Sequence, residues 1–308
     1  MFEAGQKILV VGGSGFIGRH IVSRALSLSL NVTSLGFSAR TSLVVNDQTI
    51  KHYVVDLNNA ALIKERLNAD KFDYVVNCGG YIDHALFNNG GRKNFENHLS
   101  TLINLVEAID RTKLKSFVNI GSSDEYGDAP APQAEHLREA PISPYSLGKV
   151  CASHYLQTLF RTEGFPGTTV RLFLTYGPGQ DGGRFLPQII DGCMRGINFP
   201  VSAGEQLRDF CYIDDTVTAI FLALSKPKSL GEIINVASGN PVSIREMIET
   251  VQSIIGKGTP EFGKIGYRRG ENMALYATID KADALLDWSP AISLEVGLSK
   301  MIEAYKIS

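Results

Sequence analysis

The sequence has few cysteines, and their spacing excludes several kinds of site. Cys78, Cys151, Cys193 and Cys211 lie far apart among 308 residues and form no CxxC pair. This spacing argues against a zinc site or a disulfide framework and is typical of reduced thiols in a cytoplasmic protein. We therefore expect no metal ion and a cytoplasmic location.

The chain also lacks a basic excess and long apolar runs. Its formal net charge is −2, whereas proteins that bind nucleic-acid backbones usually carry an excess of Lys and Arg. No apolar run approaches the roughly 18 residues of a membrane span. The first residues, "MFEAGQKILVVGG", do not resemble a signal peptide. We expect neither a nucleic-acid nor a membrane partner.

Short apolar runs alternate with amphipathic segments in the first half of the chain. The predicted strands are 7–11, 31–36, 52–56, 73–78, 116–121 and 168–173, and the predicted helices between them include 15–29, 60–67 and 97–110. This alternation predicts an α/β fold with a doubly wound parallel sheet of Rossmann type. Residues 1–175 would form that domain. Residues 176–308 would form a smaller C-terminal substrate-binding cap, with segments at about 210–240 returning to the sheet.

A glycine loop follows the first predicted strand. In "VVGGSGFIG", Gly12, Gly15 and Gly18 have a GxxGxxG spacing between a strand and a helix. Small residues at these positions let the backbone approach a pyrophosphate, and the N–H groups at the helix start point toward it. We predict a dinucleotide site here, to which Ser14, Phe16 and Ile17 also contribute.

The segment after the second strand bears on which dinucleotide binds. An NAD site usually has a carboxylate there for the ribose diol, but "LGFSARTS" (35–42) has none. Ser38 and Arg40 are suited to a 2′-phosphate, which favours NADP(H); otherwise Arg40 is a solvated loop residue and NAD(H) binds. Further residues expected at the dinucleotide are Phe37, Asp56, Leu57, Cys78, Gly79 and Gly80.

"SPYSLGK" (143–149) is the second strong motif. Ser143 can cap a helix, and Pro144 suits its first turn. Tyr145 and Lys149 would then lie four residues apart on one face. A nearby ammonium lowers the pKa of a tyrosine, so we predict a catalytic Tyr145–Lys149 pair that also contacts the dinucleotide.

Together these motifs resemble the extended short-chain dehydrogenases/reductases of the nucleotide-sugar epimerase/dehydratase superfamily. The resemblance covers nearly the whole chain and rests on "GGSGFIG", "GSSDEYG", "YSLGK", "RLFLTYGPG", "GEQLRDFCYIDD" and "RRGENMALYATIDKADALLDW". It is closest to reductases of nucleotide-linked 4-keto-deoxyhexoses, abequose synthase among them.

The resemblance implies roles for "GSSDEYG" (121–127). Ser122, or Ser123 if the alignment shifts by one, would hydrogen-bond the sugar oxygen beside Tyr145. Dehydratases of the family carry an acid pair after this hydroxyl, whereas this chain has Ser123 and Asp124, which makes elimination doubtful. Asp124 and Glu125 are then either loop acids or part of the sugar pocket.

The resemblance also implies a substrate side. Arg208 and Arg268 match positions that hold the substrate diphosphate, unless each forms only a surface ion pair. Phe185 belongs to the segment that would cover the nucleotide base, and Leu174 replaces a family asparagine. The predicted substrate-binding residues are Ser122, Ser123, Asp124, Leu174, Phe185, Arg208 and Arg268.

We therefore expect reduction of the C4 ketone of a nucleotide-linked deoxyhexose by NADPH. Tyr145 would protonate the new oxygen, and Lys149 would hold the nicotinamide ribose. The alternatives are a 4-epimerase with tightly bound NAD, a 4,6-dehydratase and a non-catalytic cofactor sensor. The resemblance also implies a homodimer formed through a four-helix bundle of the helices at 97–110 and 145–163.

Overall fold

A computed structural model describes residues 2–37, 42–68, 70–267 and 271–307. Its main sheet has eight strands in the order β12-β7-β6-β5-β1-β2-β4-β3. Their bounds are β1 (Lys7–Val11), β2 (Asn31–Gly36), β3 (Ser42–Val45), β4 (Gln48–Val54), β5 (Tyr74–Asn77), β6 (Ser116–Ser122), β7 (Gly167–Leu172) and β12 (Ile233–Val236). All neighbouring strands run parallel except β3 and β4.

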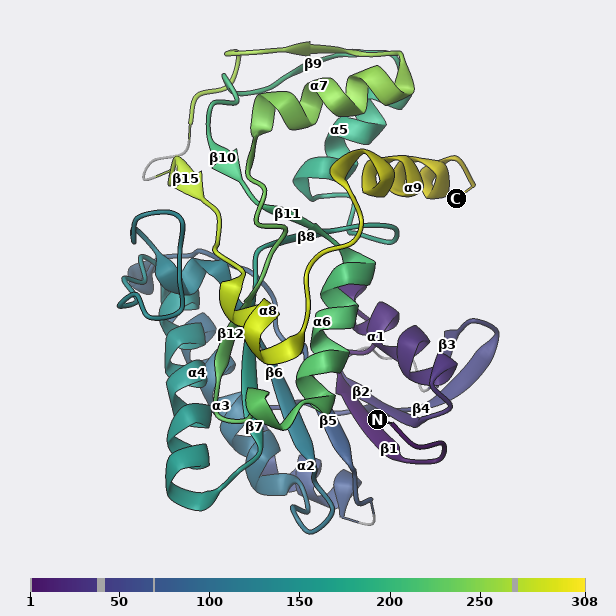
Figure 1. The fold of residues 1–308 in the computed structure, drawn as a ribbon, viewed down its shortest axis with the longest axis vertical. Helices are drawn as coiled ribbons and strands as arrows, with labels where there is room; N and C mark the ends of the chain where they lie inside the picture. The colour runs from purple at the N-terminus through teal and green to yellow at the C-terminus, as the bar shows by residue number, and fades with distance from the viewer. Residues whose placement is uncertain (1, 38–41, 69, 268–270, 308) are drawn as a thin grey trace.

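Helices cover both faces of this sheet (Figure 1). On one face lie α2 (Ala60–Leu67), α3 (Gly91–Ala108) and α4 (Pro144–Glu163), and on the other α1 (Phe16–Ser27), α6 (Ile213–Ser225) and α8 (Asp280–Leu286). Strand β1 shows why both faces are needed. Ile8 and Val10 belong to the cluster with α1 and α6, while Leu9 and Val11 belong to the cluster with α2, α3 and α4. The predicted doubly wound α/β fold is confirmed.

The edge of the sheet differs from the prediction. We predicted one strand at 52–56, but the structure has an antiparallel hairpin of β3 and β4. Asn46 and Asp47 form its turn, with φ angles of 50° and 59°. Asn and Asp adopt such angles more readily than most residues, so the pair was a hairpin signal that the sequence analysis missed.

A smaller group of elements lies at the upper end of the molecule in Figure 1 and is called the cap here. Its helices are α5 (Phe185–Met194), α7 (Ile244–Ile255) and α9 (Leu294–Ile307). Its strands are β8 (Leu174–Tyr176), β9 (Asn198–Pro200), β10 (Leu207–Arg208), β11 (Phe210–Tyr212), β13 (Val242–Ser243), β14 (Thr259–Glu261) and β15 (Ala274–Leu275). They pair as β13-β10-β15, β11-β8 and β14-β9. Because α6 and β12 pack on or in the main sheet, the chain crosses between the two parts several times.

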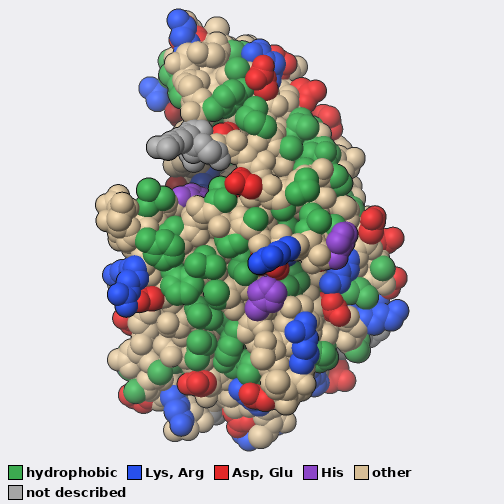
Figure 2. All heavy atoms as spheres, turned by 90° about the vertical axis from the view of Figure 1, so that its left-hand side faces the viewer, with side chains coloured by type: hydrophobic (Ala, Val, Ile, Leu, Met, Phe, Trp, Pro, Cys, Tyr) green, Lys and Arg blue, Asp and Glu red, His purple; other side chains and the backbone are tan. Residues whose placement is uncertain are grey.

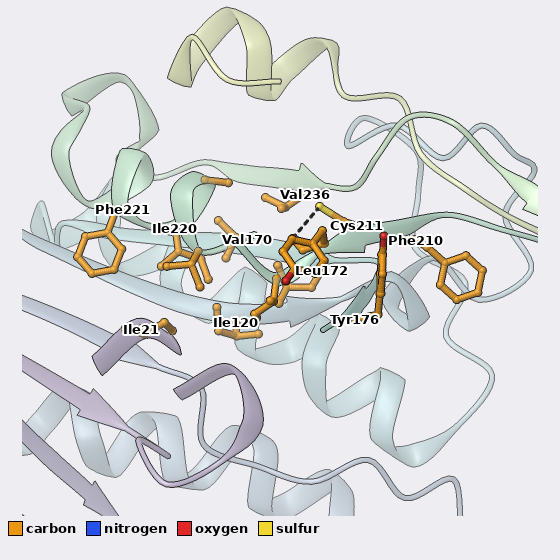
Figure 3. Packing of buried hydrophobic residues seen from close by; sticks show 14 of the residues in the cluster. Ile21, Ile120, Val170, Leu172, Tyr176, Phe210, Cys211, Ile220, Phe221 and Val236 are labelled. Carbon is orange, nitrogen blue, oxygen red and sulfur yellow. Dashed lines mark hydrogen bonds between the residues drawn. The ribbon is translucent and has the colours of Figure 1, made fainter. Parts of the chain in front are cut away.

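A continuous hydrophobic core joins the cap to the sheet (Figure 3). It runs from Ile120 and Leu172 on the sheet, past Ile220 of α6, to Tyr176 and Phe210 on the cap strands. The cap strands β8 and β11 therefore share one core with α6 and the main sheet. In the described part of the chain, no helix is both long enough and apolar enough to cross a membrane.

Candidate active site

The predicted site residues follow the ends of neighbouring strands. Gly12 follows β1, Phe37 follows β2, Asp56 follows β4, Cys78 follows β5, and Ser122 ends β6. The five strands are parallel and adjacent, so their carboxyl ends meet at one edge of the sheet. Strand β1 lies between β5 and β2, where the winding of the chain reverses, and ligands bind at such a point in open α/β sheets.

The glycine loop is tightly folded between β1 and α1. Gly12 has a φ of +77°, and its N–H donates to the carbonyl of Leu35 at 2.7 Å. A Cβ at Gly12 would lie 2.9 Å from the carbonyl oxygen of Cys78, and one at Gly18 would overlap the carbonyl oxygen of Gly12. Gly15 caps α1, so the first N–H groups of this helix open toward the sheet edge. This geometry fits a dinucleotide pyrophosphate.

One glycine of this loop was missed from the sequence. A Cβ at Gly13 would overlap the side chain of Ser34, whose hydroxyl lies 2.9 Å from Nδ1 of the buried His52. The doubled glycine in "VVGGSG" was the available signal. Gly13 therefore lets β2 and the loop approach each other beneath the dinucleotide site.

The other predicted dinucleotide residues surround the loop. Ser14 lies in it, and Phe16 and Ile17 form the first turn of α1. Leu57 is buried, and the thiol of Cys78 donates to the carbonyl of Val11 at 2.9 Å. Phe37 is exposed, and the carboxylate of Asp56 accepts from the N–H of Asn58. The two glycines pack closely, Gly79 against Val11 and Gly80 against His98. Ser38 and Arg40 lie outside the described residues.

Helix α4 brings Tyr145 and Lys149 to the end of β6. Ser143 caps this helix by accepting from the N–H of Ser146 at 3.1 Å, and Pro144 is in its first turn, as predicted. The buried Tyr145 shares a side-chain hydrogen bond with Ser122. Lys149 donates from Nζ to the carbonyl of Ile120 at 2.8 Å. Ser122, Tyr145 and Lys149 therefore meet at one strand end, next to the loop after β5.

The charge environment of Tyr145 differs from the prediction. We expected Lys149 to lower its pKa, but burial raises the pKa of Tyr145 well above its usual range, and Asp124 and Glu125 raise it further. The hydrogen bond with Ser122 and the charge of Arg184 oppose this shift without cancelling it. Because desolvation disfavours the phenolate, the phenol of Tyr145 keeps its proton.

Two histidines that the sequence analysis missed contact Tyr145. The ring of His98, on α3, lies 4.9 Å from that of Tyr145, and the ring of His84 lies 5.6 Å away, both edge to face. Burial and the charge of Lys149 lower the pKa of His98 to about 3, so its ring is neutral at physiological pH. Its Nε2 lies 3.1 Å from the carbonyl of Tyr81. The contacts of His84 and His98 with Tyr145 join separate segments of the chain, and no sequence motif predicts them.

The acids of "GSSDEYG" fall into different environments. Asp124 lies 3.7 Å from Nε2 of His84, and burial raises its pKa. Glu125 is fully buried and accepts from Nε of Arg171 at 2.9 Å. We had interpreted it as either a loop acid or part of the sugar pocket, and its burial fits neither role. Ser123 is buried as well. Of this group, Asp124 remains beside Tyr145 on the side of the cap.

The cap brings positive charge toward this edge. Arg208 on β10 forms an ion pair with Glu271. The charge of Asp124 also acts on Arg208 and raises its pKa, although burial lowers it more. Arg184, at the start of α5, is exposed, and its charge acts on Tyr145, although no sequence motif selects it. Phe185 begins α5 with its ring 6.3 Å from that of Phe210, and Leu174 on β8 is partly exposed. Arg268 lies outside the described residues.

Comparisons with known proteins agree with this geometry. A model of the NAD dependent epimerase/dehydratase family matches residues 8–237, well over half of the chain. An uncharacterized UDP-glucose epimerase of Bacillus subtilis (strain 168), YtcB, is 29% identical over 96% of this chain and 97% of its own length. The dTDP-glucose 4,6-dehydratase 1 of Escherichia coli (strain K12) is 25% identical over 97% and 92%. The solved structure of a UDP-glucuronic acid 4-epimerase from Bacillus cereus, in complex with UDP-glucuronic acid and NAD, is 26% identical with a TM-score of 0.83, covering 98% of this chain and 99% of that one.

Proposed function

The chain belongs to the NAD dependent epimerase/dehydratase family, and within it we propose that the protein reduces the C4 ketone of a nucleotide-linked deoxyhexose with NADPH. The observation that carries this proposal is the pair of hydroxyls at the end of β6, where the buried Tyr145 hydrogen-bonds Ser122 and a ketone oxygen could accept from both. A ketoreductase begins its reaction with this tyrosine as an acid. A 4-epimerase begins by oxidising an alcohol, for which the tyrosine must first act as a base.

Each residue of the group has a role in this reaction. The dinucleotide, when bound, supplies the hydride that adds to C4. Ser122 hydrogen-bonds the ketone oxygen and fixes it beside Tyr145. The phenol of Tyr145 gives its proton to that oxygen, so that the ketone becomes an alcohol, and solvent returns a proton to the phenolate. Lys149, held by the carbonyl of Ile120, stabilises the phenolate and holds the nicotinamide ribose.

The acids near Tyr145 support reduction over elimination. Ser123 occupies the position of the first dehydratase acid, and Glu125 is held by Arg171. Asp124 is therefore the one acid of 121–127 that faces the cap. A single acid leaves no partner to remove water between C5 and C6, which makes a 4,6-dehydratase the weaker candidate.

The proposed substrate lies between Tyr145 and the cap. Arg208 would exchange its pairing with Glu271 for the substrate diphosphate, since a guanidinium binds phosphate oxygens with two parallel hydrogen bonds. Arg268 is proposed for the same group. Phe185 would cover the nucleotide base, and Leu174 would contact the sugar. The chain would then work as a dinucleotide-binding part, residues 1–175, and a substrate cap, residues 176–308.

The proposal is tested by cofactor preference and by the fate of the hydride. Nucleotide-free protein is titrated with NADPH and NADH, and CDP-, GDP- and dTDP-linked 4-keto-6-deoxyhexoses are then offered with NADPH deuterated at C4. A reductase prefers NADPH and places one deuterium on C4 of the product for each dinucleotide oxidised. If every 4-keto sugar is left untouched, the proposal is wrong.

A 4-epimerase is the second candidate, because the relatives include a UDP-glucose epimerase and a UDP-glucuronic acid 4-epimerase solved with NAD. It would retain NAD through purification and interconvert UDP- or GDP-sugars with no net use of dinucleotide. If the protein interconverts such sugars and retains NAD, the proposed function is epimerisation and not ketoreduction.

We also propose a homodimer through α3 and α4. Hydrophobic side chains gather on the face that carries α4, between charged ones (Figure 2). Among those that the structure describes, Leu86, Phe87 and Ile142 beside the starts of these helices are 62%, 55% and 55% exposed. Exposed apolar groups of this kind mark interaction surfaces. Light scattering after gel filtration should give twice the monomer mass of 33.6 kDa, and Phe87→Glu should lower it.

A further inference from the structure

Glu125 is a fully buried acid that links the active site to a buried arginine. Its Oε1 accepts from the backbone N–H of Ser122 at 2.9 Å. Its Oε2 accepts from Nε of Arg171 at 2.9 Å and from the hydroxyl of Ser153 at 2.8 Å. One oxygen thus accepts a hydrogen bond from the end of β6, which carries Ser122. The other accepts hydrogen bonds from Arg171 on β7 and Ser153 on α4.

A structural ion pair alone does not account for this arrangement. Arg171 already pairs with Glu139 at 2.6 Å, and its guanidinium stacks on the ring of Tyr126 at 4.6 Å. A second buried carboxylate costs desolvation energy, and buried ion pairs are often replaced by apolar residues without loss of stability. Glu125 also forms a capping box with Ser122, whose side chain bonds Tyr145.

The carboxylate also lies within electrostatic reach of both residues of the tyrosine–lysine pair. Burial lowers the pKa of Lys149 on α4, and the charge of Glu125 opposes this effect. That charge also acts on Tyr145 on the same helix, where a negative charge disfavours the phenolate. The other charged or titratable groups around Tyr145 are Asp124 on η2 (Ser123–Tyr126), His84 in the loop after β5, His98 on α3 and Arg184 of the cap. Asp124 raises the pKa of Tyr145 more than Glu125 does. Glu125 is the acid that is fully buried, so salt screens its charge least.

We propose that Glu125 is a positioning residue of the active site, which fixes the Ser122 peptide from behind the strand and places a buried negative charge next to the tyrosine–lysine pair. The inference rests on the assignment of Tyr145 as the acid in the proposed function. It adds that the acid strength of Tyr145 is set from behind the strand by a group that never touches the substrate.

The test compares Glu125→Gln with Glu139→Gln. Both variants remove one carboxylate from Arg171, but only Glu125 also contacts Ser122. The glutamine side chain keeps an oxygen that can accept from the N–H of Ser122. Protein labelled with 13C at the tyrosine ζ carbon is saturated with NADP⁺ and titrated from neutral to alkaline pH. The signal missing in Tyr145→Phe identifies Tyr145.

We expect Glu125→Gln to lower the measured pKa of Tyr145 by about one unit, as for removal of a nearby like charge, and Glu139→Gln to leave it unchanged. The inference is overturned if Tyr145 titrates at the same pH in Glu125→Gln and the parent, or if Glu139→Gln shifts it as much. If Glu125→Gln fails to fold, the double variant Glu125→Leu/Arg171→Met removes the ion pair instead. Because Glu125 acts on Tyr145 and Arg171 is the more distant charge, we expect a smaller downward shift, and an unmoved or raised pKa of Tyr145 would overturn the inference.

This readout needs no sugar, so it separates the inference from the proposed function. A lowered pKa of Tyr145 in a protein that reduces no 4-keto sugar would refute the ketoreductase and keep the role of Glu125. Ketoreduction together with an unchanged pKa of Tyr145 in Glu125→Gln would support the ketoreductase and refute the role of Glu125.

Discussion

The two sides of the site are built in different ways. On the sheet side, Ser122, Tyr145 and Lys149 are fixed by buried hydrogen bonds to strand β6 and helix α4. On the cap side, Arg208 forms an ion pair with Glu271 and donates to the carbonyl of Leu207, and Arg184 is exposed. Rigid, desolvated contacts suit the chemical step, in which small displacements are costly. Charges that can exchange partners suit the capture of substrates, and the cap is where relatives of one family would differ.

Tyr145→Phe tests the sheet side most severely. Loss of the phenolic proton should reduce turnover about 10²- to 10⁴-fold, the usual contribution of a general acid. Binding of the dinucleotide, measured by calorimetry, should be nearly unchanged because the ring stays in place. Activity that survives in this variant would show that another group protonates the product.

Gly18→Ala tests the loop beneath the dinucleotide. A Cβ at this position would overlap the carbonyl oxygen of Gly12. Overpacking of this kind costs about 1–3 kcal/mol, so we expect dinucleotide affinity to fall about ten- to a hundredfold. Gly182→Ala, on the cap side, is the matched control because no atom lies within 4 Å of its added methyl group. Equal losses in both variants would contradict the tight packing of the loop.

Arg208→Gln tests the cap side. Loss of a charge-assisted pair with the diphosphate should raise KM about tenfold, with kcat nearly unchanged. Glu271→Gln should lower KM slightly, because it releases Arg208 from its ion pair. Steady-state kinetics of the two variants measure both effects. A fall in kcat with unchanged KM in Arg208→Gln would place this arginine at the reacting atoms instead.

The same contrast explains what the sequence could predict. Apolar periodicity predicted the sheet because each strand must be buried on both faces, as Leu9 and Val10 of β1 show. Glycine and YxxxK spacings selected residues that the structure places at one sheet edge, because local motifs carry those positions. Glu125 was interpreted only as a loop acid or part of the sugar pocket, and His98 was not selected, since the contacts of Glu125 with Arg171 and of His98 with Tyr145 join segments far apart in the chain. The direction of the Tyr145 pKa was wrong because burial, which spacing does not reveal, outweighs the neighbouring lysine.

His98 offers the subtlest test of the sheet side. Burial and Lys149 hold its pKa at about 3, far below the usual value of about 6.5. Between these two values the unfolded chain binds a proton that the folded protein does not. The free energy of unfolding therefore falls as the pH drops through this range, by about 1.4 kcal/mol per pH unit from this residue alone.

Replacing His98 by Asn should remove that part of the pH dependence. Urea unfolding followed by circular dichroism between pH 6.5 and pH 4.5 measures the slope in the parent and the variant. The half-exposed His84, on the cap side of Tyr145, provides the matched control. If His84→Asn flattened the slope as much as His98→Asn, acid sensitivity would belong to the solvent-facing side of the site. A smaller slope in His98→Asn alone would show that the buried side sets the limit of stability in acid.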